Sequence, residues 1–323
     1  MIAIVAIAMA AGAASALMFA SITSGALISL LLLYLAPLPL MVAALGWGPL
    51  CATIGGIAAA SALGLLFGLP LCIAYAITVA LPAWWLGHLV LLGRPAAGST
   101  PPGDGATAPN LEWYPTGRIL VWIVGFAALT TAAALLSFGG DATTITASMK
   151  RGLLRFMGQQ GMATSADTER AVDALVWIAP GLAAIGALMN LTINLWLAGR
   201  ITATSGRLHR PWPDLKGTAM PPMTLVVLCV AIALCFTSGL VAMSAQIASA
   251  ALLMAYALTG FAVLHTVTLA LKARALWLTC TYIITVMFVW PVLILMVMVG
   301  LADAVFGLRE RFLRMRPPPL PAP

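Results

Sequence analysis

Long apolar stretches separated by short polar ones dominate the pattern of this chain. Each stretch is about 20 residues or more, which is long enough for a helix that crosses a bilayer. Nine such stretches cover residues 2–22, 26–46, 48–69, 70–92, 118–138, 174–199, 222–242, 244–271 and 276–301. The pattern predicts an all-α polytopic membrane helix bundle with eight or nine transmembrane segments.

The second stretch contains two prolines at membrane depth, Pro37 and Pro39. Each proline removes a backbone donor and clashes with the preceding turn, so we expect this segment to be broken or re-entrant there. Backbone groups freed in a membrane need protein or a water-filled cavity around them. We therefore predict that Tyr34, Pro37 and Pro39 contribute to a ligand-binding site.

The third stretch carries small residues at every fourth position, a spacing that lets another helix backbone approach closely in lipid. We interpret this stripe as a packing surface and expect its helix to lie at the centre of the bundle. The stripe consists of Gly48, Ala52, Gly56, Ala60, Gly64 and Gly68.

Polar side chains are concentrated in one place in the sixth stretch, at Asn190, Thr192 and Asn194. Asn190 and Asn194 are four residues apart, so their amides lie on the same face of a helix. In lipid these amides need partners, which can be groups on another helix or on a ligand. Interhelical hydrogen bonding is the simpler interpretation, and a ligand site shared with the proline break is the alternative.

Composition narrows the class of protein further. Of the 323 residues, 62% are hydrophobic and 8% are charged, whereas a soluble domain has about 25% charged residues. The bilayer is therefore an expected partner. The net charge of +7 does not indicate nucleic-acid binding, because the basic residues lie in loops and in the tail, as in other membrane proteins.

The distribution of reactive side chains argues against an enzyme. All nine acidic residues fall in predicted loops or at helix ends, although proton relays and ion-coupled pumps place carboxylates inside the membrane. The three histidines are far apart and the five cysteines form no C-x-x-C pair, so no metal or cofactor site is predicted. We expect no catalytic residue unless His88 or His265 meets an acid from a loop.

The predicted organisation is one transmembrane domain with a short tail. Residues 1–302 form the domain and residues 303–323 a basic tail with a disordered, proline-rich end. Within the domain we expect a flexible linker at 93–117, an amphipathic surface segment at 139–173 and a basic loop at 199–221.

Basic residues do not fix the orientation if all nine stretches cross, because eight then lie on each side. If one stretch after residue 222 is incomplete, the tail joins the 199–221 loop on one side. We predict that this side is cytoplasmic and that the protein lies in the bacterial cytoplasmic (inner) membrane.

Several motifs resemble those of the YybS-like family of bacterial multi-pass membrane proteins of unknown function. They are the run 25–34, Ala36-Pro37-Leu38-Pro39, Gly46-Trp47-Gly48, the run 81–87, Asn190 with Asn194 and Arg200, and the ending 300–303 with Arg309. That family is distantly similar to the S components of energy-coupling-factor transporters, which capture a vitamin or metal. S components dock on an ATP-driven module through an Ala-x-x-x-Ala face, and Ala6, Ala10 and Ala14 have that spacing.

Two functions follow as hypotheses. The resemblance and the lack of intramembrane acids imply a non-enzymatic transport or ligand-capture component without its own energy coupling. Its expected partners are an unidentified small molecule and an ATP-driven transport module. The alternative is a structural or assembly protein that docks partner proteins through small-residue helix faces and its basic tail.

Overall fold

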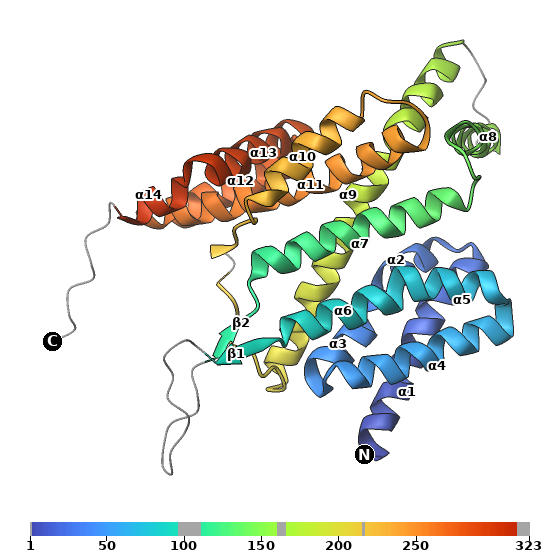
Figure 1. Ribbon diagram of the computed structural model, residues 1–323, viewed down its shortest axis with the longest axis horizontal. Coiled ribbons are helices and arrows are strands. Elements are labelled where there is room, and N and C mark those ends of the chain that lie inside the picture. Colours follow the sequence, from blue (N-terminus) through green and yellow to red (C-terminus); the bar gives the residue numbers. More distant parts are fainter. Residues whose placement is uncertain (1, 96–110, 160–165, 215–216, 315–323) are drawn as a thin grey trace.

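The structure is a computed structural model that describes residues 2–95, 111–159, 166–214 and 217–314 (Figure 1). Eight helical runs within these residues are long and apolar enough to cross a membrane, so the predicted all-α polytopic bundle is confirmed. The runs are Ile2–Ser24, Leu27–Trp47, Pro49–Phe67, Leu69–Val90, Thr116–Leu136, Ala166–Thr204, Gly239–Val267 and Val289–Phe306.

The helices gather into two groups (Figure 1). The first group contains α1 (Ile2–Ala20) with the short turn Ser21–Ser24, α2 (Leu27–Leu35), α3 (Pro37–Trp47), α4 (Pro49–Phe67), α5 (Leu69–Tyr75) with the turn Ala76–Ala80, and α6 (Leu81–Val90). The second contains α10 (Met223–Leu234), α11 (Gly239–Val267) with the turn Thr268–Ala270, α12 (Arg274–Met287), α13 (Val289–Phe306) and α14 (Leu308–Arg314).

Two helices, α7 (Thr116–Leu136) and α9 (Ala166–Thr204), lie between the groups and contact both of them. With a rise of 1.5 Å per residue, α9 is about 58 Å long, almost twice what a bilayer core requires. The amphipathic helix α8 (Ala142–Gln159) packs near the start of α9, where Lys150 pairs with Asp173. These central helices determine how the two groups are joined.

The seventh predicted segment, 222–242, is wrong as a single span. Its helix α10 has 12 residues, about 18 Å at 1.5 Å per residue, so it is too short to cross. The chain then turns through Thr237 and Ser238, and Gly239 has a φ of 71° that favours glycine. The hydropathy pattern does not reveal this turn, because only Thr237 and Ser238 interrupt the apolar sequence there.

The last predicted segment, 276–301, is also divided. Phe288 has φ −129° and ψ 63°, which ends α12 and begins α13. Pro291 explains the position of the break, because it cannot donate to the carbonyl of Met287 and its ring would clash there. Hydropathy alone does not indicate the boundary between α12 and α13, because the sequence on both sides is strongly apolar.

The small-residue helix α4 is not central, contrary to the prediction. Among the candidate spans, α11 has the largest buried share and α4 only an intermediate one. The closest approach on α4 occurs at Gly55, where a Cβ would overlap the backbone of Ala8 on α1. The stripe residues Gly56 and Gly64 face Ala80 and Cys72 instead. The stripe therefore packs against the neighbouring hairpin of its own chain.

The ends of the predicted linker 93–117 are ordered against each other. Strands β1 (Gly93–Pro95) and β2 (Leu111–Trp113) pair in antiparallel register, and Arg94 forms a salt bridge with Glu112 at 2.8 Å. The middle of the linker, 96–110, lies outside the described residues, as does the predicted disordered end of the tail beyond residue 314.

Candidate functional site

The helix is interrupted only locally between α2 and α3, at the segment 34–39 that contains Pro37 and Pro39, which we call the proline junction. Ala36 keeps helical dihedral angles, so the segment continues as one apolar run from Leu27 to Trp47 that is long enough to cross a membrane. Side chains from other helices bind the backbone here. Ser15 on α1 donates to the carbonyl of Ala36 at 2.6 Å, and Tyr75 donates to the Ser15 hydroxyl at 2.8 Å.

Asn194 on α9 supplies the other partner at this junction. Its Nδ2 donates to the carbonyl of Tyr34 at 2.8 Å, and the backbone and side-chain oxygens of Asn190 also lie at 2.8 Å. Asn194 is only 1% exposed, and its Oδ1 has no partner among the described residues. The asparagine therefore joins α9 to the proline junction by an interhelical hydrogen bond.

Replacing Asn194 by leucine is expected to lower the free energy of unfolding by about 1–3 kcal/mol, because the Tyr34 carbonyl loses its buried partner. Denaturation in mixed micelles would measure the change. The matched control is Asn190→Leu, which leaves the bond to Tyr34 in place and should cost less. Equal losses in the two variants would contradict the assigned role of Asn194.

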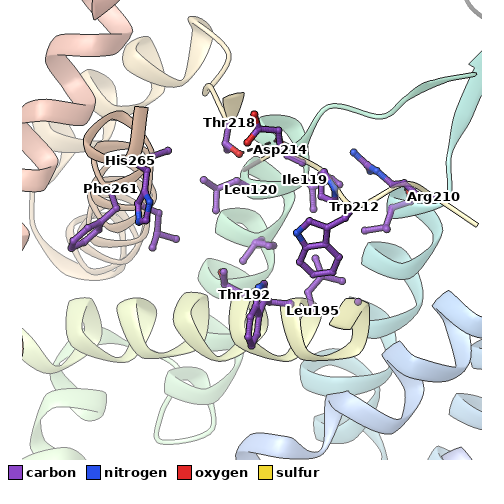
Figure 2. Close-up of a pocket in the computed structure, with 18 of the residues that line it drawn as sticks. Ile119, Leu120, Thr192, Leu195, Arg210, Trp212, Asp214, Thr218, Phe261 and His265 are labelled. Atoms are coloured by element: carbon purple, nitrogen blue, oxygen red, sulfur yellow. Dashed lines mark hydrogen bonds between the residues drawn. The ribbon is translucent and has the colours of Figure 1, made fainter. Parts of the chain in front are cut away.

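A separate cavity lies where the two helix groups meet. Its volume is about 730 Å³, and its lining is mostly aliphatic and aromatic. Small-molecule sites are commonly cavities of this size with a few polar groups placed among apolar ones. The lining includes Val90 from the end of α6, Ile119, Leu120 and Ile123 from α7, Thr192, Leu195 and Trp196 from α9, Leu258 and Phe261 from α11, and Trp212, Pro213 and Thr218 from the 205–222 loop (Figure 2).

The loop that closes one side of the cavity is fixed at Thr218. The hydroxyls of Thr218 and Thr116 lie 3.1 Å apart, and the Thr218 carbonyl accepts from Arg309 Nη1 at 2.8 Å. At Gly117 a Cβ would overlap the carbonyl of Ala219, so only glycine lets the loop approach α7 this closely. The cavity wall is thus held from both α7 and the start of the tail.

Arg309 is itself held by a buried ion pair with Asp303. Its Nε and Nη2 lie 2.8 and 2.6 Å from Asp303 Oδ2, and its backbone N–H donates to Oδ1 at 2.9 Å. Both residues are 8% exposed. Gly307, with φ 62°, ends α13 and returns the chain to make this contact. The tail therefore begins beside the 205–222 loop, as the incomplete-segment interpretation predicted.

Three polar side chains face different parts of the cavity. Arg210 is almost fully buried, and its Nη1 donates to the Val90 carbonyl at 3.2 Å. His265 Nε2 lies 2.7 Å from the hydroxyl of Tyr282, so the histidine pairs with a residue of α12. Asp214 also lines the cavity, which brings His265 and a loop acid to the same site.

The structure separates the sequence-predicted site residues. Thr192 lines the cavity, although its hydroxyl donates back to the Leu188 carbonyl at 2.8 Å. The other five belong to the proline junction or its surroundings and are absent from the cavity lining: Tyr34, Pro37, Pro39, Asn190 and Asn194. Sequence reasoning missed Arg210 and Trp212, and the tryptophan two residues after the arginine in Arg-Pro-Trp-Pro was the available signal.

Comparison with known proteins supplies the family. A family model described as "Predicted membrane protein (DUF2232)" matches residues 12–304. Neither the curated proteins nor the solved structures contain a significant match to the chain. The matched range includes all eight candidate spans in whole or in large part, together with the cavity. The chain therefore belongs to the DUF2232 family of membrane proteins.

Proposed function

We propose that this protein is a non-enzymatic ligand-capture or transport component of a membrane system. The observation that carries the proposal is the cavity of about 730 Å³ between the two helix groups. A cavity of this size with a mostly apolar lining suits one small molecule. The polar side chains that line the cavity differ in chemical type and come from separate elements, so we propose that they bind a ligand.

Enzymatic chemistry has less support from the geometry. His265 and Asp214 share the cavity, but the histidine is bonded to Tyr282 and each has its own partners. No group of three or more metal-binding side chains occurs within the described ranges. A binding role for these polar side chains therefore requires the fewest additional assumptions.

Energy coupling would come from a partner, which we propose to be an ATP-driven transport module. The face with Ala-x-x-x-Ala spacing on α1 is available for such a contact, because Ala6 and Ala10 are exposed and Ala14 is half-buried. A purely structural docking role has weaker support, because the α4 stripe packs within the chain and Arg309 is buried.

We also propose a location in the bacterial cytoplasmic membrane with the tail on the cytoplasmic side. The tail and the 205–222 loop meet through Arg309 and Thr218, so their basic residues lie on one side. Basic residues accumulate on cytoplasmic loops. The cavity, which this loop lines, would then lie near the cytoplasmic end of the bundle.

Blocking the cavity tests the proposal. Ala262 is a half-buried lining residue on α11, so Ala262→Phe should fill part of the cavity. In native mass spectrometry from mild detergent, the wild type should carry a bound small molecule that the variant has lost. The matched control is Ala233→Phe on the exposed face of α10, which should keep it. A wild-type protein with no bound small molecule, or an adduct that survives Ala262→Phe, would count against ligand capture.

A further inference from the structure

Arg210 is a buried cation that no carboxylate neutralises among the residues the structure describes. Arg210 is 7% exposed, and its Nη1 donates a hydrogen bond to the Val90 carbonyl. Within the described ranges no carboxylate forms an ion pair with it. Charged side chains this deeply buried normally pair with an opposite charge, because the loss of hydration is otherwise uncompensated.

The neighbouring charges are already engaged. The guanidinium carbon of Arg200 lies 5.2 Å from the ring centre of Trp212, and that of Arg207 lies 4.6 Å from the ring centre of Trp47. Asp214, the acid that lines the same cavity, has a partner of its own and no ion pair with Arg210. Among the described charged side chains that line the cavity, Arg210 thus keeps donor nitrogens for a ligand.

The chemistry of the guanidinium indicates what that ligand carries. Burial lowers the pKa of Arg210 from its ordinary value, yet an arginine side chain stays protonated at neutral pH. It has five donors in a planar fork, and here one nitrogen is used by a backbone carbonyl. Carboxylate and phosphate groups match this fork with two parallel hydrogen bonds.

The remaining lining indicates an apolar body. Figure 2 shows Arg210 and Trp212 on one side of the cavity and Phe261 on the other, with Leu120 and Leu195 between them. A ligand with only a charged head would leave these surfaces without contacts, whereas a hydrocarbon or ring body would cover them. The cavity therefore combines one anion-binding group with an extended apolar wall.

We propose that the cavity binds an amphipathic anion whose carboxylate or phosphate head pairs with Arg210 and whose apolar body lies toward Phe261. This inference rests on the proposed ligand-capture function and adds the chemical class of the ligand. The same chemistry occurs in anionic membrane lipids and in water-soluble amphipathic acids. The two sources are therefore separated by experiment.

Two matched probes test the class without any change to Arg210. They are 2-bromododecanoate and the neutral 2-bromododecan-1-ol, whose bromine lies beside the head group and quenches tryptophan fluorescence at close range. Trp212 lines the cavity, so the difference between wild type and Trp212→Phe isolates quenching at this site. In neutral detergent, the carboxylate should bind the full-length protein about tenfold more tightly than the alcohol, since its head bonds to a charged group.

Variants test the assigned residue. Arg210→Gln should weaken binding of the carboxylate about tenfold and leave the alcohol unchanged. The matched control is Arg94→Gln, since Arg94 is exposed and does not line the cavity. Equal affinity for the two probes, or unchanged binding by a folded Arg210→Gln protein, would overturn the inference. If that variant does not fold, the comparison of the two probes on the wild type still decides whether the cavity prefers an anionic head group.

The remaining outcomes separate this inference from the function on which it rests. Saturable binding of both probes with equal affinity would leave ligand capture standing and reject the anionic class. Failure of both probes to quench Trp212 would count against the proposed function and the inference together. Phosphatidylglycerol retained by wild type and lost from Arg210→Gln in native mass spectrometry would identify a lipid source. Binding of the soluble carboxylate without such retention would identify a water-soluble acid.

Discussion

Replacing Gly300 by leucine is expected to lower the free energy of unfolding by about 3 kcal/mol, the upper end of typical overpacking effects. Gly300 on α13 meets the backbone of α11, where a Cβ would overlap the carbonyl of Tyr256 and lie 2.8 Å from Thr259 Oγ1. Gly260 makes the reciprocal contact with the carbonyl of Met296. Because both obstacles are backbone atoms of packed helices, the two helices must separate to admit a side chain.

The measurement is denaturation of the purified protein in mixed micelles, followed by circular dichroism. The matched control is Gly186→Leu in α9, because a Cβ at Gly186 meets nothing within 4 Å and that substitution should change stability by only about 0.5 kcal/mol. Gly260→Leu should behave like Gly300→Leu. If Gly300→Leu were as stable as the Gly186 control, the close packing of α11 on α13 would be refuted.

Removing one partner of the buried ion pair should have a similar or larger effect. Arg309→Ala is expected to cost about 3–5 kcal/mol, because Asp303 would remain buried without its counter-charge. The variant also removes the hydrogen bond to the Thr218 carbonyl, so the 205–222 loop should loosen. Denaturation in mixed micelles reports the first effect, and faster hydrogen exchange in the loop reports the second.

An exposed ion pair in the same helix provides the comparison. Arg314 and Glu310 are 3.8 Å apart and about four-fifths exposed, so Arg314→Gln should cost at most about 1 kcal/mol. The double variant Asp303→Leu with Arg309→Met should recover part of the stability, since it leaves no unpaired charge. A loss for Arg309→Ala no greater than that for Arg314→Gln would show that the buried pair is not needed.

Whether the tail lies on the same side of the helices as the 205–222 loop depends on the helix boundaries after residue 222. Counting nine crossing segments gave equal numbers of basic residues on the two sides and no orientation. The 12-residue α10 is too short to cross, and Arg309 reaches Thr218 in the loop before it. Two apolar stretches after residue 222 contained turns that hydropathy alone does not reveal, because Ser238 and Pro291 interrupt them only briefly.

Sequence reasoning identified part of the polar framework correctly. The sequence shows directly that two prolines lack N–H groups and that two asparagines lie on one helix face. Both features need hydrogen-bond partners, which predicted that the asparagines lie at the proline junction. Asn194 does donate to the carbonyl of Tyr34. The sequence could not place Ser15 and Tyr75 at the same junction, because serine and tyrosine have many acceptable environments in an apolar helix.

The cavity required the tertiary structure. Arg210 belongs to a loop that reads as an ordinary basic membrane-side segment, and its burial depends on how Thr116, Thr218 and Arg309 hold that loop over the helix ends. These contacts join residues about 90 to 100 positions apart. Sequence patterns do not indicate which residues meet over such a separation. By itself, the sequence determined the membrane class, most of the spans and the local need of the proline junction for partners. Only the packing of the two helix groups decided which charge is buried and where a ligand can fit, because burial is a property of the assembled surface.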